Sequence, residues 1–295
     1  GHGAVMVSLN KGSYFQAPQW AISQFCVSQN YIDNNKHPRI VKDINKDGKA
    51  DIIGFGPNGI QIAYGNSNGT FNNFKTLASD FTQKRPYQSD WPQGWSDFYN
   101  YPRFIEDMNG DGWPDIIGFA NNAVWVVLNN NGFSSVNGSH RWVNNFTKAQ
   151  GWQNTNNYMR LVADMNNDGK ADIVGFGGNG VYVSLTNSSG IGAVNPVLWS
   201  SDFGQTNEWT ENEKYPRFLN DMNNDGLLDI IGFGHYDTKV ALNSGNSFGN
   251  TDVWSSEFGT FEGWGDYQSH PKFIGDINGD GFQDFLSIGS DEILV

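Results

Sequence analysis

The pattern of apolar and polar residues repeats five times along the 295-residue chain. Each repeat has a short apolar strand, an Asp-rich polar loop, a nearly continuous apolar run, and then a run that alternates apolar and polar residues. Continuous apolar runs of about five residues are typical of strands buried on both faces, whereas alternation is typical of half-buried strands. The loop and the run that follows it occupy residues 43–55, 107–119, 164–176, 221–233 and 276–288.

Each repeat predicts four strands. The first ends at the loop, as at 102–107, and the second follows it, as at 115–119. The third is an alternating run at 59–64, 123–128 or 180–185, and the fourth ends near an aromatic residue, as at 142–146 or 199–203. Gly, Asn and Ser turns separate the last two strands. The longest spacing between loops contains a polar, Pro-containing insertion at 84–93, which we interpret as a loop.

Repeats of this size with four short strands predict the blades of a β-propeller. We expect an all-β fold in which residues 1–295 form a single β-propeller domain with five four-stranded repeats. The chain starts with a third strand at 4–9 and a fourth at 19–25, and it ends with the start of a third at 292–295. Five blades closed by the N- and C-terminal strands would remove an exposed sheet edge. The alternative is part of a larger, seven-bladed-type array.

The Asp-rich loops predict a metal site in every repeat. Each loop has the form D-x-N-x-D-G-x-x-D, which places carboxylate and amide oxygens at alternate positions of a tight turn. Hard oxygen ligands suit Ca²⁺, and the Gly permits the turn. We therefore predict about five structural Ca²⁺ ions, in loops 43–51, 107–115, 164–172, 221–229 and 276–284. The predicted ligands are Asp43, Asn45, Asp47, Asp51, Asp107, Asn109, Asp111, Asp115, Asp164, Asn166, Asp168, Asp172, Asp221, Asn223, Asp225, Asp229, Asp276, Asn278, Asp280 and Asp284.

Two other interpretations of these loops are weaker. An EF-hand needs a bidentate Glu at its twelfth position, and that position counted from Asp164 is Gly175. Asx-type turns without an ion would explain one such loop, but not five copies of the same ligand set. The formal net charge of −13 also favours bound cations, because about half of the 31 acidic residues lie in these loops.

Composition and motifs exclude several classes of function. The acidic balance argues against binding to nucleic acid, which requires a basic surface. No apolar stretch approaches the roughly 18 residues of a transmembrane segment, and a lone Cys26 excludes an internal disulfide framework. The chain has no G-x-S-x-G element, no phosphate-binding loop and no repeated pair of carboxylates outside the metal loops. We therefore expect a binding protein and not an enzyme.

The repeat resembles two known families. The metal loop followed by I-I-G-F-G resembles the FG-GAP repeats of integrin α-chain propellers. The whole repeat, with G-F-G-x-x-G-V-Y at 175–182, N-S-N-G-T-F at 66–71 and G-W at 151–152, is more similar to the Psathyrella velutina lectin family of fungal, calcium-containing propellers. This second resemblance spans essentially the whole chain, although that family has seven blades and only five metal loops are present here.

The lectin resemblance implies pockets between neighbouring blades for N-acetylglucosamine- or sialic-acid-type sugars. The matching positions form an aromatic–aromatic–cation cluster in each repeat: an indole covers a pyranose face, and a cation binds polar groups of the sugar. The alternative for each cluster is structural, with Trp packed between blades and Arg bonded to the backbone. The candidate ligand-binding residues are Tyr31, His37, Arg39, Trp95, Tyr101, Arg103, Trp152, Tyr158, Arg160, Trp209, Tyr215, Arg217, Trp264, His270 and Lys272.

Together these features predict a calcium-stabilised, multivalent carbohydrate-binding protein, extracellular or at the cell surface, with glycans or glycoconjugates as partners. The alternative is an integrin-like protein-adhesion or scaffold module of a larger protein. Such a module would use one face with unlike loops, and the insertion at 84–93 is the candidate for it. The pattern makes no prediction about the oligomeric state or about which sugar is bound.

Overall fold

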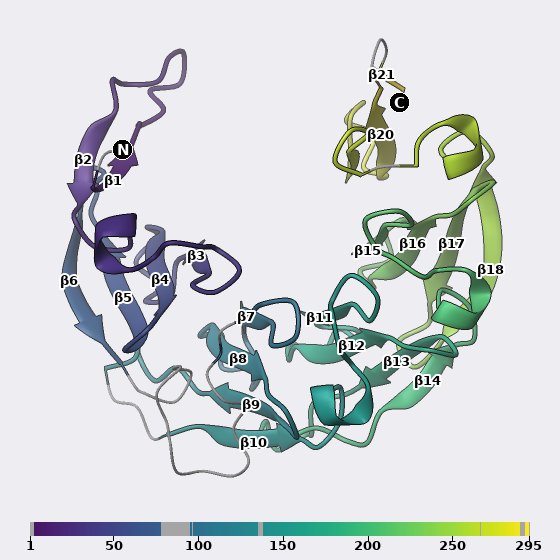
Figure 1. Ribbon diagram of the computed structural model, residues 1–295, viewed down its shortest axis with the longest axis horizontal. Helices are drawn as coiled ribbons and strands as arrows, with labels where there is room; N and C mark the ends of the chain where they lie inside the picture. Colours follow the sequence, from purple (N-terminus) through teal and green to yellow (C-terminus); the bar gives the residue numbers. More distant parts are fainter. Residues whose placement is uncertain are drawn as a thin grey trace. The chain divides into compact units, whose positions relative to one another are not determined.

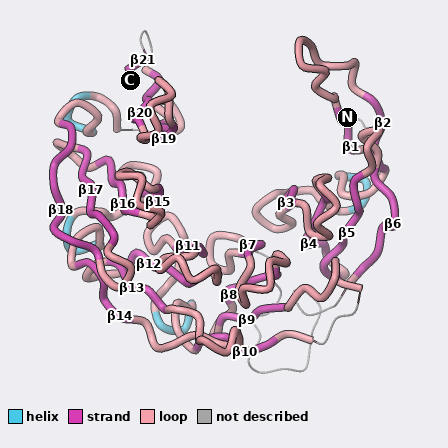
Figure 2. The backbone as a smooth tube through the Cα atoms, turned by 180° about the vertical axis from the view of Figure 1, so that it is seen from behind, coloured by secondary structure: helices cyan, strands magenta, loops and turns pink. Residues whose placement is uncertain are grey.

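The computed structural model describes residues 3–77, 95, 97–134, 138–265, 267–289 and 293–294. These residues form β-strands and four one-turn 3₁₀ helices, labelled η, and contain no α-helix (Figure 2). None of the helices in this part of the chain has the length and apolarity to cross a bilayer. The insertion predicted at 84–93, and positions 292 and 295 of the predicted last strand, lie outside the described residues. The chain divides into two compact units, Gly1–Gly151 and Trp152–Val295.

The first unit contains three antiparallel sheets. Two of them have four strands in sequence order, β3 to β6 and β7 to β10, and the other pairs β1 with β2 (Figure 1). The strands are β1 Val5–Val7, β2 Gln19–Ile22, β3 Arg39–Lys42, β4 Asp51–Gly56, β5 Gly59–Gly65, β6 Phe71–Thr76, β7 Arg103–Glu106, β8 Asp115–Phe119, β9 Val124–Val127 and β10 His140–Val143, with helices η1 Val27–Gln29 and η2 Lys148–Gln150.

The second unit repeats this plan. It has two four-stranded sheets, β11 to β14 and β15 to β18, and a sheet of three described strands, β19 to β21. The strands are β11 Arg160–Ala163, β12 Asp172–Phe176, β13 Val181–Ser184, β14 Val197–Ser200, β15 Arg217–Asn220, β16 Asp229–Phe233, β17 Thr238–Asn243, β18 Phe248–Ser255, β19 Lys272–Gly275, β20 Asp284–Ile288 and β21 Ile293–Leu294, with helices η3 Gln205–Asn207 and η4 Thr260–Glu262.

The all-β class and the five repeats are confirmed. Each Asp-rich loop joins the first and second strands of one sheet, and four of these five sheets have the expected four strands. The meander of each sheet, with every strand beside its neighbours in sequence, is that of a propeller blade. The single domain and the closure by the terminal strands involve both units, and they stay predictions, as does the larger array.

The second strand of each of the first four repeats forms the centre of the core. Strands β8, β12 and β16 are buried at all five positions, and β4 at all six. Within each unit, side chains of neighbouring sheets share one apolar cluster, as Ile53 does with Ile116 and Val174 does with Ile230. A strand covered on both faces needs apolar residues at consecutive positions, which explains the run I-I-G-F in place of alternation.

The fourth strands end earlier than the pattern predicts. Strand β10 ends at Val143 and β14 at Ser200, whereas we expected the strands to continue to Phe146 and Phe203. Phe146 and Phe203 have φ angles of 58° and 59°, a left-handed conformation that cannot continue a strand. In each case the Oδ1 atom of the preceding residue, Asn145 or Asp202, accepts the Phe backbone N–H at 2.7 Å. The chain therefore turns away from the sheet just before the buried aromatic ring.

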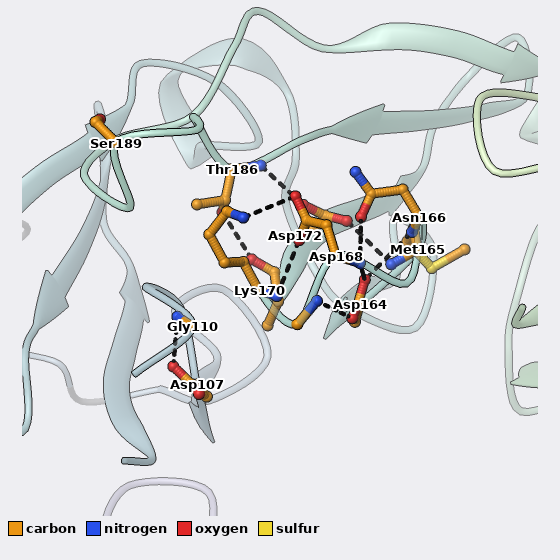
Figure 3. Close-up of polar contacts among 12 residues, drawn as sticks. Asp107, Gly110, Asp164, Met165, Asn166, Asp168, Lys170, Asp172, Thr186 and Ser189 are labelled. Carbon is orange, nitrogen blue, oxygen red and sulfur yellow. Dashed lines mark hydrogen bonds and ion pairs between the residues drawn. The ribbon is translucent and has the colours of Figure 1, made fainter. Parts of the chain in front are cut away.

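In each of the first four repeats, a buried carboxylate hydrogen-bonds the loop to its sheet. In the third repeat Asp172 has no exposed surface, and its Oδ2 accepts the N–H of Met165 at 3.0 Å. Its Oδ1 accepts the N–H of Thr186 at 2.8 Å, beyond the end of β13 (Figure 3). One side chain thus joins the start of the loop, the start of β12 and the end of β13. The same pair of bonds recurs at Asp51, Asp115 and Asp229.

Replacing this carboxylate should therefore destabilise the fold. Asp172→Ala leaves the buried N–H groups of Met165 and Thr186 without their acceptor, and we expect the free energy of unfolding to fall by about 2–5 kcal/mol. Urea denaturation in the presence of EDTA measures this without a contribution from metal. The control is Asp168→Ala in the same loop, where a half-buried ion pair with Lys170 and a hydrogen bond from the Lys170 N–H are lost and the expected change is about 1 kcal/mol. Equal losses for the two variants would contradict the special role of Asp172.

Candidate functional site

The Asp-rich loops are tight turns held by their own side chains. In the third repeat, Asp164 accepts backbone N–H bonds from Asp168 at 3.2 Å and Gly169 at 2.8 Å, and the Asn166 Oδ1 also accepts the Asp168 N–H (Figure 3). Gly169 has a φ angle of 81°, a conformation that a side chain would strain. The loop therefore gathers the oxygen atoms of two side chains around one short stretch of backbone.

The placement of the predicted metal ligands follows their position in the loop. In the first four loops the first Asp and the Asn are half-buried, the second Asp is exposed and the last Asp is buried. In the fifth loop Asp276, Asn278 and Asp280 are exposed and Asp284 is half-buried. No group of three or more His, Cys, Asp or Glu side chains in the described part of the chain is arranged to hold a metal ion. Both oxygens of the last Asp accept backbone N–H groups in each of the first four loops.

The donor chemistry of the loops nevertheless fits a hard cation. Burial, together with the smaller effect of the charges of Asp111 and Asp107, raises the pKa of Asp115 to about 7. Burial likewise raises the pKa of Asp172 to about 7. A nearby cation would favour the ionised form of these carboxylates. The residues present therefore suit Ca²⁺, which takes carboxylate and amide oxygens.

The loops differ in whether a Lys side chain stands at their seventh position. Lys49 and Lys170 form ion pairs with Asp47 and Asp168, each at 2.9 Å. A hydrogen bond from Lys49 lowers the pKa of Asp47. The corresponding positions of the other three loops hold apolar side chains, namely Trp113, Leu227 and Phe282. Those three loops have no built-in ammonium group at that position to offset their carboxylates.

The predicted sugar-binding clusters lie mainly inside the protein. Trp95, Arg103 and Arg160 are each 1% exposed, and Trp209 is 3% exposed. The others are buried or half-buried: Tyr31, His37, Trp152, Tyr215, Arg217, Trp264 and Lys272 are buried, and Arg39, Tyr101, Tyr158 and His270 are half-buried. We had expected open indole faces, and burial instead places these rings in the packing between strands and loops.

The buried cations bind backbone carbonyl groups. The Arg217 Nη1 donates to the carbonyl oxygens of Phe203 at 3.1 Å and Trp209 at 3.3 Å. Burial lowers the pKa of Arg217 to about 10, so the guanidinium stays charged at neutral pH. In the fifth repeat the Lys272 Nζ makes the equivalent bond to the Trp264 carbonyl at 2.7 Å. These contacts match the structural alternative for the clusters, and direct contact of the cations with sugar stays a prediction.

The same cations also join neighbouring sheets. Arg103, Arg217 and Lys272 each lie over a Phe at or near the end of the second strand of the preceding repeat. In the first unit Arg103 is 5.5 Å from the Phe55 ring, and in the second unit Arg217 is 5.1 Å from Phe176. Lys272 is 5.7 Å from Phe233. The recurring Phe of I-I-G-F thus has a specific partner in the next repeat.

A small, open pocket of about 80 Å³ lies beside one of these clusters, in the second unit. One wall comes from the segment before β15, and the other comes from β17 and the loop that precedes it. The lining residues are Asn207, Glu208, Trp209, Tyr215, Gly234, His235, Tyr236, Asp237 and Lys239. The structure therefore brings two predicted residues, Trp209 and Tyr215, to a pocket.

The other lining residues were missed by the sequence analysis, although a signal was present. The two residues after G-F-G or G-F-A are P-N, N-N and G-N in the first three repeats, but His235 and Tyr236 in the fourth. A search for residues shared by the repeats does not detect these two positions, because their residues differ from those of the first three repeats. The departure supplies the pocket with two rings, and Asp237 directly follows them.

The pocket combines aromatic, acidic and basic groups. The Trp209 Nε1 donates to the Asp202 Oδ1 at 3.1 Å, which fixes the indole, and the Tyr215 ring packs edge-on to it at 6.4 Å. Glu208 and Asp237 contribute carboxylates, and the Lys239 Nζ lies 3.9 Å from the Asp202 Oδ2. Convergent polar groups beside aromatic rings are typical of small-molecule sites.

Comparison with known proteins places the chain in a family. Residues 107–175 match the FG-GAP-like repeat family. The structure is similar to that of an Agrocybe aegerita lectin described as recognising non-reducing terminal N-acetylglucosamine, with a TM-score of 0.89 and 32% identity over 99% of this chain and 70% of that chain. This chain belongs to the family of the Agrocybe aegerita lectin. The narrower resemblance to the Psathyrella velutina lectin stays a prediction.

More distant structures add only to the description of the fold of this lectin family member. The Tc holotoxin pore of Photorhabdus luminescens has a TM-score of 0.57 and 15% identity, over 98% of this chain and 12% of that chain. A rhamnogalacturonan lyase of Bacillus licheniformis has a TM-score of 0.38 and 13% identity, over 96% and 58% of the two chains, which is too low to bear on function. No curated protein sequence matches the chain.

The burial of the repeated indoles predicts that they support the fold of this lectin family member. Trp209→Ala removes a side chain that is 3% exposed, and we expect a loss of about 3–5 kcal/mol in the free energy of unfolding. Trp254→Ala in β18 is the control, because this indole is 45% exposed and its removal should cost about 1 kcal/mol or less. Chemical denaturation followed by circular dichroism measures both. An unchanged stability for Trp209→Ala would show that the indole is not part of the core.

Proposed function

We propose that this chain is a lectin that binds a neutral, N-acetylglucosamine-type sugar in the pocket beside Trp209. The observation that carries the proposal is the lining of that pocket, which sets aromatic rings beside two carboxylates, an amide and an ammonium group. Membership of the Agrocybe aegerita lectin family supports the same conclusion. The activity is binding and not catalysis.

Each kind of lining group has a partner on a pyranose. The carboxylates of Glu208 and Asp237 can accept hydrogen bonds from sugar hydroxyl groups, and charge-assisted bonds of this kind are the strong ones. Asn207 and Lys239 offer donors for hydroxyl or acetamido oxygens. The Tyr236 ring, 61% exposed, offers an apolar face to the C–H groups of the ring.

The charge of the pocket favours a neutral sugar over sialic acid. The lining holds two carboxylates, Glu208 and Asp237, and one ammonium group, which already lies near Asp202. An acidic sugar would meet like charges here, and the chain as a whole carries a formal charge of −13. Sialic acid is therefore the weaker candidate for this pocket.

We propose further sugar sites at the clusters of Trp95, Trp152 and Trp264, with unequal affinities. The repeats share the buried indole but differ in what faces it. In the third repeat Tyr182 packs edge-on to Trp152 at 6.3 Å, whereas Lys239 holds the corresponding strand position in the fourth. Glycans outside the cell or on its surface would then be the partners, and multivalency would raise the avidity for them.

A titration with N-acetylglucosamine tests the pocket. We expect saturable binding by isothermal calorimetry, and we expect Asp237→Ala to weaken it at least about tenfold, because a charge-assisted hydrogen bond is lost. Asp252→Ala removes an exposed carboxylate of β18 that does not line the pocket, and it should leave the affinity unchanged. Identical affinities of the two variants would show that the sugar does not bind beside Asp237.

We also propose that the five loops bind structural Ca²⁺ through their Asp and Asn side chains. The support is the recurrence of the same oxygen set and the absence of a Lys from the seventh position of three loops. Bound to these loops, an ion would neutralise carboxylates and tie the first strand of a repeat to the second. The FG-GAP-like match covers two of the loops, 107–115 and 164–172.

Metal analysis tests the calcium proposal. Protein dialysed against calcium and then against metal-free buffer should retain about five ions per chain, and EDTA should lower its melting temperature, because a ligand of the folded state stabilises it. Asp107→Asn should reduce the count by one ion, whereas Asp252→Asn, outside the loops, should not change it. Two or fewer ions, or a melting temperature that is insensitive to confirmed metal removal, would refute structural calcium.

A further inference from the structure

One backbone contact recurs beside the site in successive repeats. The middle residue of the 3₁₀ helix donates its N–H to the carbonyl of the loop between the second and third strands. The bonds are Ala149 to Asn121 at 2.9 Å, Thr206 to Gly178 at 2.9 Å, and Phe261 to His235 at 2.7 Å. Since this hydrogen bond is shared by the second, third and fourth repeats, the residues at its two ends can be compared position by position.

In the fourth repeat, the side chains at this hydrogen bond and next to it are aromatic. His235, Tyr236 and Phe261 stand where the third repeat has Gly178, Asn179 and Thr206. The ring centroids of His235 and Tyr236 are 4.2 Å apart, and those of Tyr236 and Phe261 are 5.4 Å apart. We call these three residues the aromatic ledge.

The aromatic ledge is exposed but ordered. Tyr236 is 61% exposed and Phe261 is 66% exposed, so neither ring contributes its full area to the core. The His235 Nδ1 lies 2.6 Å from the Thr260 Oγ1, and this contact fixes the orientation of the imidazole beneath them. A contiguous exposed apolar surface with a fixed geometry is typical of a binding surface.

The aromatic ledge continues the pocket. His235 and Tyr236 line the pocket, whereas Phe261 does not, and its ring packs against both of them, with centroids 5.4 Å from Tyr236 and 6.0 Å from His235. A sugar held between Trp209 and Asp237 therefore has rings beside it on which a linked residue can lie. The apolar C–H face of a second pyranose matches such rings in size and chemistry.

We propose that the aromatic ledge is a second subsite that binds the sugar residue linked to the terminal one, so that the preferred ligand is an oligosaccharide of at least two residues. This inference rests on the proposed function of the pocket. It assigns to Phe261 a role in ligand selection that the second and third repeats lack, since their equivalents are Ala149 and Thr206.

The test compares N-acetylglucosamine with disaccharides that carry it at the non-reducing end, linked β1→2, β1→3, β1→4 or β1→6 to a second pyranose. We expect at least one disaccharide to bind the parent protein about fivefold to tenfold more tightly than the monosaccharide, as stacking on one or two rings provides. Phe261→Ala should abolish this gain and leave the monosaccharide affinity unchanged within about twofold, because Phe261 does not line the pocket. The matched control is Tyr14→Ala, which removes a ring that is 64% exposed in the other unit and should preserve the gain.

The outcomes separate the two proposals. Monosaccharide binding with no gain for any disaccharide would overturn the ledge subsite and leave the proposed function intact. A gain that persists in both Phe261→Ala and Tyr236→Ala would also overturn it. No binding of N-acetylglucosamine by the parent protein would instead refute the proposed function, and the subsite with it. Melting curves of each variant confirm that it is folded, as the exposure of both rings leads us to expect.

Discussion

The buried carboxylates of Asp51, Asp115, Asp172 and Asp229 hold the repeat together. Each has no exposed surface, and each accepts two backbone N–H bonds from segments on either side of the second strand. A carboxylate is costly to bury, and these bonds offset only part of that cost. The arrangement leaves negative charge close beneath a surface loop that carries two further Asp side chains. With calcium bound as proposed, the stability of the fold and the attraction of the loop for the cation would have the same origin.

The repeated aromatic–cation clusters support the fold, whereas the pocket is the proposed site of ligand binding. Arg103, Arg217 and Lys272 use their donors on backbone carbonyls and lie over a Phe of the preceding repeat, so they hold sheets together. Under the function proposed above, recognition depends instead on loop residues that differ between repeats, such as His235 and Asp237. A lectin built in this way can change its ligand in one repeat while the packing of the sheets stays the same.

The sequence predicts the regular part of the fold well and the site poorly. Strand β8 has the predicted bounds, and all five loops join the predicted strands, because periodicity and turn residues act locally. The ends of β10 and β14 were wrong, since the left-handed Phe146 and Phe203 depend on how their rings are packed. Burial of Arg103 and Arg217 also could not be predicted, because an Arg that binds carbonyls and an Arg that binds sugar occur in the same sequence pattern. The pocket depends on His235 and Tyr236. These residues differ from those at the same positions of the first three repeats, so a search for the shared repeat does not find them.

The order of the strands has a consequence for how the chain folds during synthesis. In every described sheet each strand pairs only with the strands next to it in sequence. Pairing of this kind closes short loops, which cost little chain entropy, so contact order is low for an all-β protein. A sheet can therefore form as soon as its own residues leave the ribosome, before the next repeat exists. Until that repeat arrives, however, one apolar face of the newest sheet stays in water, where it is open to aggregation. The slow and vulnerable step of folding is then the stacking of finished sheets, and the waiting time for it is set by the rate of translation.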